Sequence, residues 1–359
     1  MASEAVVING RFLTQRMSGV QRYAFELLNA WTEIRCVQAR ILVSKTASLA
    51  AEPTAALSRS YPLVSIGRQA GHAWEQTELR MAAGDDFLVN LCNTAPLERR
   101  AQLVTIHDAA VWRQPTAYNW RFRSLYKALL PAIARKSLKL LTVSKFSAGE
   151  LCSLFQLSSK NIEIVPNGAD HILRIPADET VLRRNGLETQ SYLLAVGGAS
   201  PHKNIASLAG IEHLLSAHNL RLVCVGSQET AVFARTAQAF GASVCALGAV
   251  TDGELRALYE NALGLIFPSL YEGFGIPPAE AMACGCPVLS STAAALPEVC
   301  GEAALYFDPR DRSSLFSAVT QFLGSPRLRS ELREAGLERV KLFCWLSSAT
   351  EFNSIVSAC

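Results

Sequence analysis

Short apolar runs alternate with longer stretches of helical spacing along the whole 359-residue chain. In the first half, the apolar runs Ala5–Ile8, Phe87–Leu91 and Leu103–Ile106 are each followed by polar or glycine-containing segments. Between such runs lie amphipathic stretches, of which Trp120–Lys136 and Phe146–Phe155 are the clearest. This alternation predicts a parallel sheet with helices on both of its faces.

The pattern stops after Pro166–Gly168 and starts again at Tyr192. The polar stretch 169–188 has no strong periodicity, so we expect the linker there. We therefore predict an α/β protein of two doubly wound, Rossmann-like domains, residues 1–180 and residues 186–344. Because ligands of such sheets bind beyond the carboxyl ends of the strands, the residues that directly follow each strand are the candidates for chemistry.

The strongest candidate is the segment Ser269–Met282, which follows an expected strand. Its glycines let the backbone approach a ligand, and its two prolines suit a helix start whose N–H groups can bind phosphate. Glu272 and Glu280 flank this turn and can accept hydrogen bonds from sugar hydroxyls. Each also has a simpler explanation, Glu280 as a complement to the helix dipole and Glu272 as an exposed loop charge. Their combination around a Gly-x-Gly turn favours a binding site.

Two further candidates follow other strands. Lys203 lies at the start of a helix expected from about Asn204, where a cation is unfavourable unless an anion binds nearby. The alternative is an ordinary solvated lysine. His107, followed by Asp108, comes directly after the strand Leu103–Ile106. A single histidine at such a place is more often a satisfied structural group than a catalytic one.

Taken together, these motifs resemble the family-4 retaining glycosyltransferases, which have the GT-B fold of two Rossmann-like domains facing across a deep cleft. The Glu-x7-Glu pattern carries the resemblance, which continues through Gly285–Val288, Leu296–Val299 and Ala303–Pro309. The late element Phe343–Trp345 also matches, and the resemblance implies that a final helix, about 345–359, packs back on the first domain. The implied activity is metal-independent transfer of a sugar from a nucleotide-sugar donor, with retention of anomeric configuration.

The resemblance also assigns roles to individual residues. The catalytic residues would be His107, Lys203 and Glu272, with Glu272 contacting hydroxyls of the donor sugar and Lys203 neutralising the diphosphate. The donor-binding residues would be Gly19, Gly198, Lys203, Gly248, Glu272, Gly273, Phe274, Gly275, Ile276 and Glu280, the last of these binding the ribose. Arg22 and Asp108 are the acceptor candidates. Many members have an arginine where this chain has Gly198, so the usual Arg–Lys pair is incomplete here.

The sequence context most resembles bacterial mannosyltransferases that build surface polysaccharides. GDP-mannose is therefore the expected donor, and a glycan or a lipid-diphosphate-linked oligosaccharide is the expected acceptor. UDP-glucose and dTDP-rhamnose remain open as donors. An epimerase or sugar-phosphate synthase of the same fold and an inactive homologue with a scaffold role remain open as functions. No cofactor is expected, and no metal site either, because the spacing of Cys284 and Cys286 is not that of a zinc pair.

The charge of the chain is unevenly distributed. Residues 1–185 hold 23 lysines and arginines against 15 acidic residues, whereas residues 186–359 hold 11 against 16. The basic half, and within it the aromatic-bearing helix Trp120–Lys136, would suit an anionic lipid surface; chance surface charge and an ordinary amphipathic helix are the alternatives. Nucleic-acid binding is not expected, because no dense basic cluster with interleaved aromatic residues is present. Ten cysteines, mostly in apolar runs, and no signal peptide predict a cytoplasmic protein, peripheral on the inner face of the plasma membrane.

Overall fold

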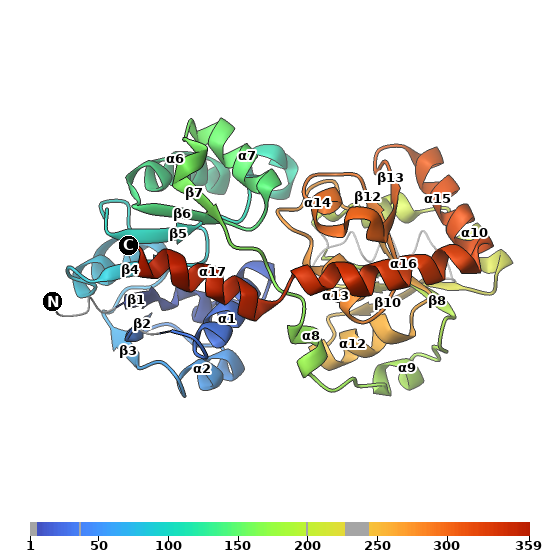
Figure 1. Cartoon of the computed structure of the whole chain (residues 1–359), viewed down its shortest axis with the longest axis horizontal. Helices are drawn as coiled ribbons and strands as arrows, with labels where there is room; N and C mark the ends of the chain where they lie inside the picture. Colours follow the sequence, from blue (N-terminus) through green and yellow to red (C-terminus); the bar gives the residue numbers. More distant parts are fainter. Residues whose placement is uncertain (1–5, 36, 199, 227–243) are drawn as a thin grey trace. The chain divides into compact units, whose positions relative to one another are not determined.

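A computed structural model describes residues 6–35, 37–198, 200–226 and 244–359. The chain forms two compact units. Unit 1 comprises Met1–Trp112, Tyr118–Gly168 and Trp345–Cys359, and unit 2 comprises Arg113–Ala117 and Ala169–Cys344. In each unit a parallel sheet carries helices on its faces (Figure 1), which confirms the predicted pair of Rossmann-like folds.

The sheet of unit 1 is parallel throughout, in the order β3-β2-β1-β4-β5-β6-β7. Its strands are β1 (Val6–Asn9), β2 (Ala39–Ser44), β3 (Leu63–Ile66), β4 (Phe87–Asn90), β5 (Gln102–Thr105), β6 (Lys139–Thr142) and β7 (Ile162–Ile164). The chain first builds outward from β1 to β2 and β3, then returns to the other side of β1 with β4. The topological switch point of this sheet therefore lies between the carboxyl ends of β1 and β4.

The helices of the first 168 residues flank this sheet, and the last helix of the chain joins them. They are α1 (Gly19–Trp31), α2 (Ala51–Leu57), α3 (Gly71–Trp74), the π-helix η2 (Glu75–Leu79), α4 (Arg80–Ala82), α5 (Ala110–Arg113), α6 (Trp120–Lys136), α7 (Lys145–Phe155) and α17 (Trp345–Ser357), with 3-10 turns η1 (Gly10–Thr14) and η4 (Ser159–Asn161). The 3-10 turn η3 (Pro115–Ala117) belongs to unit 2. Helix α17 packs along α1, where the indole Nε1 of Trp31 donates to Asn353 Oδ1 at 2.9 Å. The last fifteen residues are thus part of unit 1.

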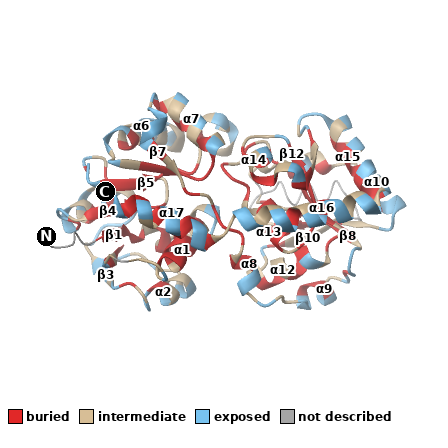
Figure 2. Ribbon diagram, viewed as in Figure 1, coloured by how far each residue is buried: buried red, intermediate tan, exposed pale blue. Residues whose placement is uncertain are grey.

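The sheet of unit 2 is also parallel, in the order β10-β9-β8-β11-β12-β13. Its strands are β8 (Tyr192–Val196), β9 (Arg221–Val225), β10 (Val244–Gly248), β11 (Gly264–Phe267), β12 (Val288–Ser291) and β13 (Ala304–Phe307). Successive side chains alternate between two cores: Leu222 belongs to one and Val223 to the other. Figure 2 shows these strands as mostly buried. The switch point of this sheet lies between the carboxyl ends of β8 and β11.

Helices cover both faces of this second sheet. They are α8 (His171–Arg174), α9 (Thr180–Arg184), α10 (Glu212–Ala217), α12 (Asp252–Asn261), α13 (Ile276–Ala283), α14 (Leu296–Cys300), α15 (Arg312–Gly324) and α16 (Pro326–Arg339), with 3-10 turns η5 (Pro201–Lys203), η6 (Ile205–Leu208), η8 (Gly301–Ala303) and η9 (Val340–Leu342). The stretch expected to be a linker instead packs on α12: Asp178 N donates to Gly253 O at 2.9 Å, and Arg256 Nη1 donates to Ile175 O at 2.8 Å. The long segment of unit 2 therefore begins at Ala169, earlier than the domain boundary expected near residue 180.

Helix α6 has the bounds that the sequence predicted, and it exposes two large apolar side chains. Its buried residues are Leu130, Ile133 and Ala134, whereas Trp120 is 70% exposed and Leu125 is 49% exposed. The basic residues Arg121 and Lys127 are exposed on the same helix. In the part of the chain that the structure describes, no helix combines the length and the apolar character needed to cross a bilayer.

Gly168 has no room for a side chain. A Cβ at this position would lie 2.5 Å from the backbone nitrogen of Trp345, whose side chain is fully buried. We expect Gly168→Ala to lower the free energy of unfolding by about 1–3 kcal/mol, because neither the backbone nor the packed indole can move away. The control is Gly149→Ala inside α7, where an added Cβ meets no atom within 4 Å and should stabilise by up to about 1 kcal/mol. Urea unfolding of both variants checks this, and equal stability of Gly168→Ala and wild type would contradict it.

Candidate functional site

Two loops meet at the switch point of unit 2. The loop after β8 ends in Lys203, and the loop after β11 contains Glu272. Lys203 Nζ lies 2.7 Å from Glu272 Oε1, with side chains that are 21% and 12% exposed. Leu270 N donates to His202 O at 2.7 Å, which ties the two loops together. The structure thus brings together two of the predicted catalytic residues at the edge where sheets of this kind bind ligands.

The surroundings of Lys203 differ from the expected helix start. Instead of an α-helix from about Asn204, two 3-10 turns flank Asn204, which has a left-handed φ of 55°. The Asn204 side chain donates to Pro268 O and Pro309 O, both at 3.1 Å, and this holds the turn in place. The predicted conflict between Lys203 and a helix dipole therefore does not arise, and Glu272 balances its charge.

The glycine-containing loop Gly273–Ile276 leads into α13. Gly275 precedes the helix with a φ of 105°, and a Cβ there would lie 2.6 Å from Leu296 Cδ2, so both the conformation and the space require glycine. Phe274 is buried, and its ring meets the edge of Phe343 with 5.2 Å between centroids. This packing holds the start of α13, and the N–H groups of its first turn, in a fixed position.

Glu280 is buried within α13 and is held by two side chains. His171 Nε2 lies 2.9 Å from Oε1, and the Tyr259 hydroxyl donates to Oε2 at 3.1 Å. Burial, reinforced by the nearby carboxylate, raises the pKa of Tyr259 well above its ordinary value, so its hydroxyl stays protonated and donates. The first turn of α13 contains no acidic residue, so the explanation of Glu280 as a dipole complement is wrong. Glu280 is instead a carboxylate of fixed orientation.

His171 and Tyr259 were not identified from the sequence. His171 lies in the stretch that was expected to be a linker, and Tyr259 lies in the ordinary amphipathic helix α12. Neither residue carries a local signal in the sequence. His171 is 109 residues from Glu280 and Tyr259 is 21 residues from it, so only folding brings them to its carboxylate.

The remaining donor candidates of unit 2 are glycines at strand ends. Gly198 is half-buried after β8, next to Ala199, which lies outside the described residues. Gly248 ends β10 with a φ of 72°, and its carbonyl accepts from Gly226 N at 2.9 Å. A Cβ on Gly226 would lie 2.0 Å from Gly197 O. The backbones of these strand ends therefore pack together more closely than side chains would allow.

In unit 1, His107 follows β5 and is almost fully buried. Its Nε2–H donates to Leu91 O at 2.9 Å, and its ring lies edge-on to Tyr23 with 4.9 Å between centroids. Burial lowers the pKa of His107 to about 4, so the imidazole is neutral at neutral pH. Asp108 accepts from Ala110 N at 2.8 Å and so caps α5.

The last two candidates lie on α1 of unit 1. Gly19 is the first residue of this helix and is exposed. Arg22 faces Glu26 one turn further along, with 3.8 Å between Nη1 and Oε1. The next residue, Tyr23, packs on the ring of His107, so the structure places Arg22 and His107 on adjoining elements.

Burial of neutral His107 makes the stability of the chain depend on pH. The pKa in the folded state, about 4, is below the ordinary value of 6.5, so the unfolded chain binds a proton first as the pH falls. Stability is thus lost as the pH decreases from about 6.5 to about 4, by up to roughly 3 kcal/mol. We expect His107→Gln, whose amide can still donate to Leu91 O, to flatten this dependence. Urea unfolding at several pH values tests it, and parallel curves for both proteins would refute it.

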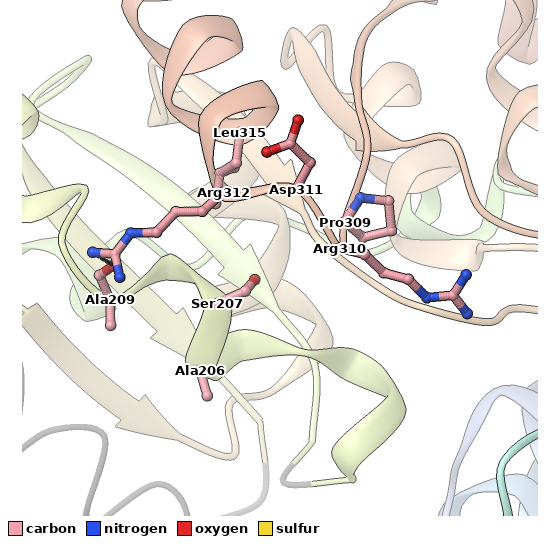
Figure 3. Close-up of a pocket in the computed structure, with 8 residues that line it drawn as sticks. All are labelled: Ala206, Ser207, Ala209, Pro309, Arg310, Asp311, Arg312 and Leu315. Atoms are coloured by element: carbon pink, nitrogen blue, oxygen red, sulfur yellow. Dashed lines mark hydrogen bonds between the residues drawn. The ribbon is translucent and has the colours of Figure 1, made fainter.

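One pocket of unit 2 lies apart from these residues. It has a volume of about 150 Å³ and is lined by Ala206, Ser207, Ala209, Pro309, Arg310, Asp311, Arg312 and Leu315 (Figure 3). Arg312 is already engaged there, since its Nη2 donates to Ala209 O at 2.9 Å. Because none of the predicted donor-binding residues lines this pocket, we do not assign the donor to it.

The described residues also bear on metal binding. They contain no group of three or more His, Cys, Asp or Glu side chains arranged to hold a metal ion. Cys284 and Cys286 are free thiols, and burial raises the pKa of Cys286 to about 12. The nine described cysteines are all free, whereas Cys36 lies outside the described residues. Metal independence of the reaction stays a prediction.

Comparison with known proteins gives matches along nearly the whole chain. Residues 178–339 match the model of the glycosyl transferases group 1, and residues 17–172 match that of glycosyltransferase family 4. The chain is 32% identical over 260 residues to the O-antigen chain mannosyltransferase B of Escherichia coli, covering 69% of this chain and 68% of that one. It is 29% identical over 336 residues to the O-antigen chain mannosyltransferase RfbU of Salmonella typhimurium, covering 88% and 90%. Among solved structures, sucrose-phosphate synthase from Thermosynechococcus elongatus has the same fold, with a TM-score of 0.76, 18% identity and coverage of 99% and 98%.

Proposed function

Because the chain belongs to the group 1 glycosyl transferases, which have the GT-B fold, we propose that it transfers mannose from GDP-mannose. The acceptor is a glycan or a lipid-linked oligosaccharide in the biosynthesis of a polysaccharide. The names of the two bacterial relatives, both O-antigen chain mannosyltransferases, support mannose and a polysaccharide product. The transfer retains the anomeric configuration, as the likeness to retaining enzymes suggests, and it proceeds without a metal ion.

The observation that carries this proposal is the Lys203–Glu272 pair at the switch point of unit 2. A departing nucleoside diphosphate needs positive charge beside it, and Lys203 supplies a cation at a partly exposed position. Only Oε1 of Glu272 contacts Lys203 at 2.7 Å, so the carboxylate can still accept hydrogen bonds from sugar hydroxyls. One ion pair thus offers groups to both halves of a nucleotide sugar.

The start of α13 complements this charge. Its first N–H groups and the positive end of the helix dipole stabilise an anion, which in this proposal is the diphosphate. Glu280, held in one orientation by His171 and Tyr259, accepts hydrogen bonds from the ribose hydroxyls. The roles of Gly19, Arg22, His107 and Asp108 of unit 1 remain predictions from the family resemblance.

A thermal-shift screen tests the donor. GDP-mannose, UDP-glucose, UDP-N-acetylglucosamine and dTDP-rhamnose are added in EDTA to wild type, Glu280→Gln and Glu254→Gln. The last is a matched control, since Glu254 is another buried carboxylate of unit 2, which caps α12. A ligand at about 100 times its Kd adds about 2.7 kcal/mol of stability. We expect GDP-mannose to stabilise wild type and Glu254→Gln but not Glu280→Gln. Stabilisation by another nucleotide sugar alone would identify that sugar as the donor in place of GDP-mannose. The absence of a thermal shift with all four nucleotide sugars would favour an inactive homologue with a scaffold role.

We further propose that α6 contacts the inner face of the plasma membrane, where lipid-linked acceptors would be met by a cytoplasmic enzyme. Exposed Trp120 and Leu125 beside basic residues support this contact. We expect the double variant Trp120→Ser, Leu125→Ser to bind phosphatidylglycerol vesicles at least fivefold more weakly in a sedimentation assay. The control is Leu346→Ser, which removes a leucine of similar exposure from α17. Equal binding by the double variant and the control would exclude α6 as the contact.

A further inference from the structure

Two of the segments through which the chain passes from one unit to the other are paired. The first passes at Gly168–Ala169 and the second at Cys344–Trp345. Within unit 2, Ala169 N donates to Phe343 O at 2.9 Å. Within unit 1, a Cβ on Gly168 would lie 2.5 Å from Trp345 N, so the two backbones are in contact there as well. The position of one segment therefore constrains that of the other.

In unit 2, each segment contacts an element of the candidate donor site. The ring of Phe343 meets Phe274 edge-on with 5.2 Å between centroids, and Phe274 belongs to the loop Gly273–Ile276. His171 follows the first segment closely, and its Nε2 lies 2.9 Å from Glu280 Oε1. A displacement of the loop or of α13 therefore reaches both segments.

In unit 1, the second segment leads to the candidate His107 through buried rings. Trp345 and Tyr23 are both fully buried, and their rings meet edge-on with 6.0 Å between centroids. Tyr23 in turn lies edge-on to His107, with 4.9 Å between centroids and 87° between the ring planes. Because buried side chains are closely packed, such rings do not reorient independently of one another. The orientation of His107 thus depends on the place of Trp345.

The two sets of contacts share the short segment Phe343–Trp345. The chain from Phe343 to Trp345 spans at most about 7 Å, so it leaves little slack between the two rings. Core packing explains the buried Trp345, which fills the space beside Gly168. It explains Phe343 less well, because this ring is only half-buried and packs on a glycine-containing loop. Chains of packed side chains of this kind can carry coupling between distant sites.

We propose that Phe343 and Trp345 are positioning residues that couple the loop Gly273–Ile276 to the ring of His107. A change in the loop acts on Phe343, passes along the chain to Trp345 and reaches His107 through Tyr23. Each ring contact lies within one unit, and the covalent chain joins the two sets. The inference rests on the proposed function, because the loop and His107 serve the same transfer reaction in that proposal.

NMR of the full chain without a ligand tests this coupling. Histidine labelled with ¹³C at Cε1 gives one signal for each of the six histidines, and His107→Gln identifies the signal of His107. Phe343→Leu removes the ring, whereas Phe343→Tyr keeps it. The matched control is Phe316→Leu. Both phenylalanines are half-buried in unit 2, and each has a guanidinium over its ring, that of Arg339 at 5.6 Å from Phe343 and that of Arg312 at 5.1 Å from Phe316.

We expect Phe343→Leu to displace the His107 signal and Phe343→Tyr to leave it near its wild-type position. Phe316→Leu should not displace it, although it removes a comparable ring. If Phe343→Leu does not fold, Phe274→Leu, which removes the other ring of the pair, takes its place in the same comparison. An unmoved His107 signal in the folded variant, or an equal displacement in Phe316→Leu, would overturn the proposal.

A thermal shift with GDP-mannose on the same samples judges the donor separately. Loss of this shift in Phe343→Leu with an unmoved His107 signal would mean that the ring only shapes the donor loop, and the coupling would be refuted. If GDP-mannose does not stabilise wild type, the donor proposal fails, whereas the NMR comparison still decides the coupling. The two proposals can therefore fail independently.

Discussion

Replacing Lys203 with methionine is expected to lower kcat for sugar transfer by about 10²–10³-fold, the cost of removing one preorganised group from a developing charge. Methionine keeps the length and the apolar stem of lysine and removes its cation. This cation lies 2.7 Å from Glu272 Oε1, so the groups that we propose for the diphosphate and the sugar already lie together in the protein without a donor. The measurement is the steady-state rate of nucleotide release with donor and acceptor present.

Lys139→Met is the matched control for this experiment. Lys139 forms an ion pair of similar geometry with Glu163, 2.9 Å apart, on the surface of unit 1. Surface pairs of this kind contribute little, so kcat should stay within about twofold of wild type. If Lys203→Met instead raised KM and left kcat unchanged, Lys203 would bind the ground state and the transition state equally and would not be a catalytic residue.

Removing the Glu280 carboxylate should destabilise unit 2 as well as abolish donor binding. In Glu280→Ala the buried His171 side chain and the Tyr259 hydroxyl lose their partner, at a cost of roughly 1–3 kcal/mol for each unsatisfied group. We therefore expect the free energy of unfolding to fall by about 2–5 kcal/mol. Urea unfolding of the full chain, followed by circular dichroism, measures this.

Tyr259→Phe separates the two effects of Glu280. It deletes one hydrogen bond to Oε2 and leaves the carboxylate and its contact with His171 in place. The expected loss is only about 1 kcal/mol of stability, with stabilisation by GDP-mannose retained. Should Glu280→Ala prove as stable as wild type, the network around Glu280 would not be a structural unit, and its rigid orientation could not explain ribose binding.

The fold and the Lys203–Glu272 pair of unit 2 were predictable from the sequence because their signals, apolar runs and short motifs, are local. The apolar run Tyr192–Val196 and the amphipathic run Trp120–Lys136 have the predicted bounds, and the family resemblance and the GT-B fold are confirmed. The edge strand β3 was missed, because its exposed positions include both Val64 and Ser65 and it has no buried run. Residues 169–188 were misjudged, since their backbone bonds to α12 depend on tertiary contacts.

The partners of the predicted residues could not be found from the sequence. Glu75 lies in a polar run with no glycine loop or strand end beside it. Only the folding of the chain brings Asn9 and Thr94 to its carboxylate. His171 reaches Glu280 in the same way. Local sequence therefore predicts residues for ligand binding, a role that stays a prediction, whereas the side chains that orient these residues are set by long-range packing.

The position of α17 determines the order in which the protein can fold during synthesis. Domains generally fold as units while the chain leaves the ribosome, N-terminal first. Unit 1 cannot do so, because the buried Trp345 and Phe352 of its last segment are made after all of unit 2. Unit 2 is therefore the first to be complete, and the N-terminal part waits with Trp31 lacking its partners Asn353 and Phe352. A stop codon ahead of Trp345 would leave a folded unit 2 joined to an unfinished N-terminal half, exposed to chaperones and proteases.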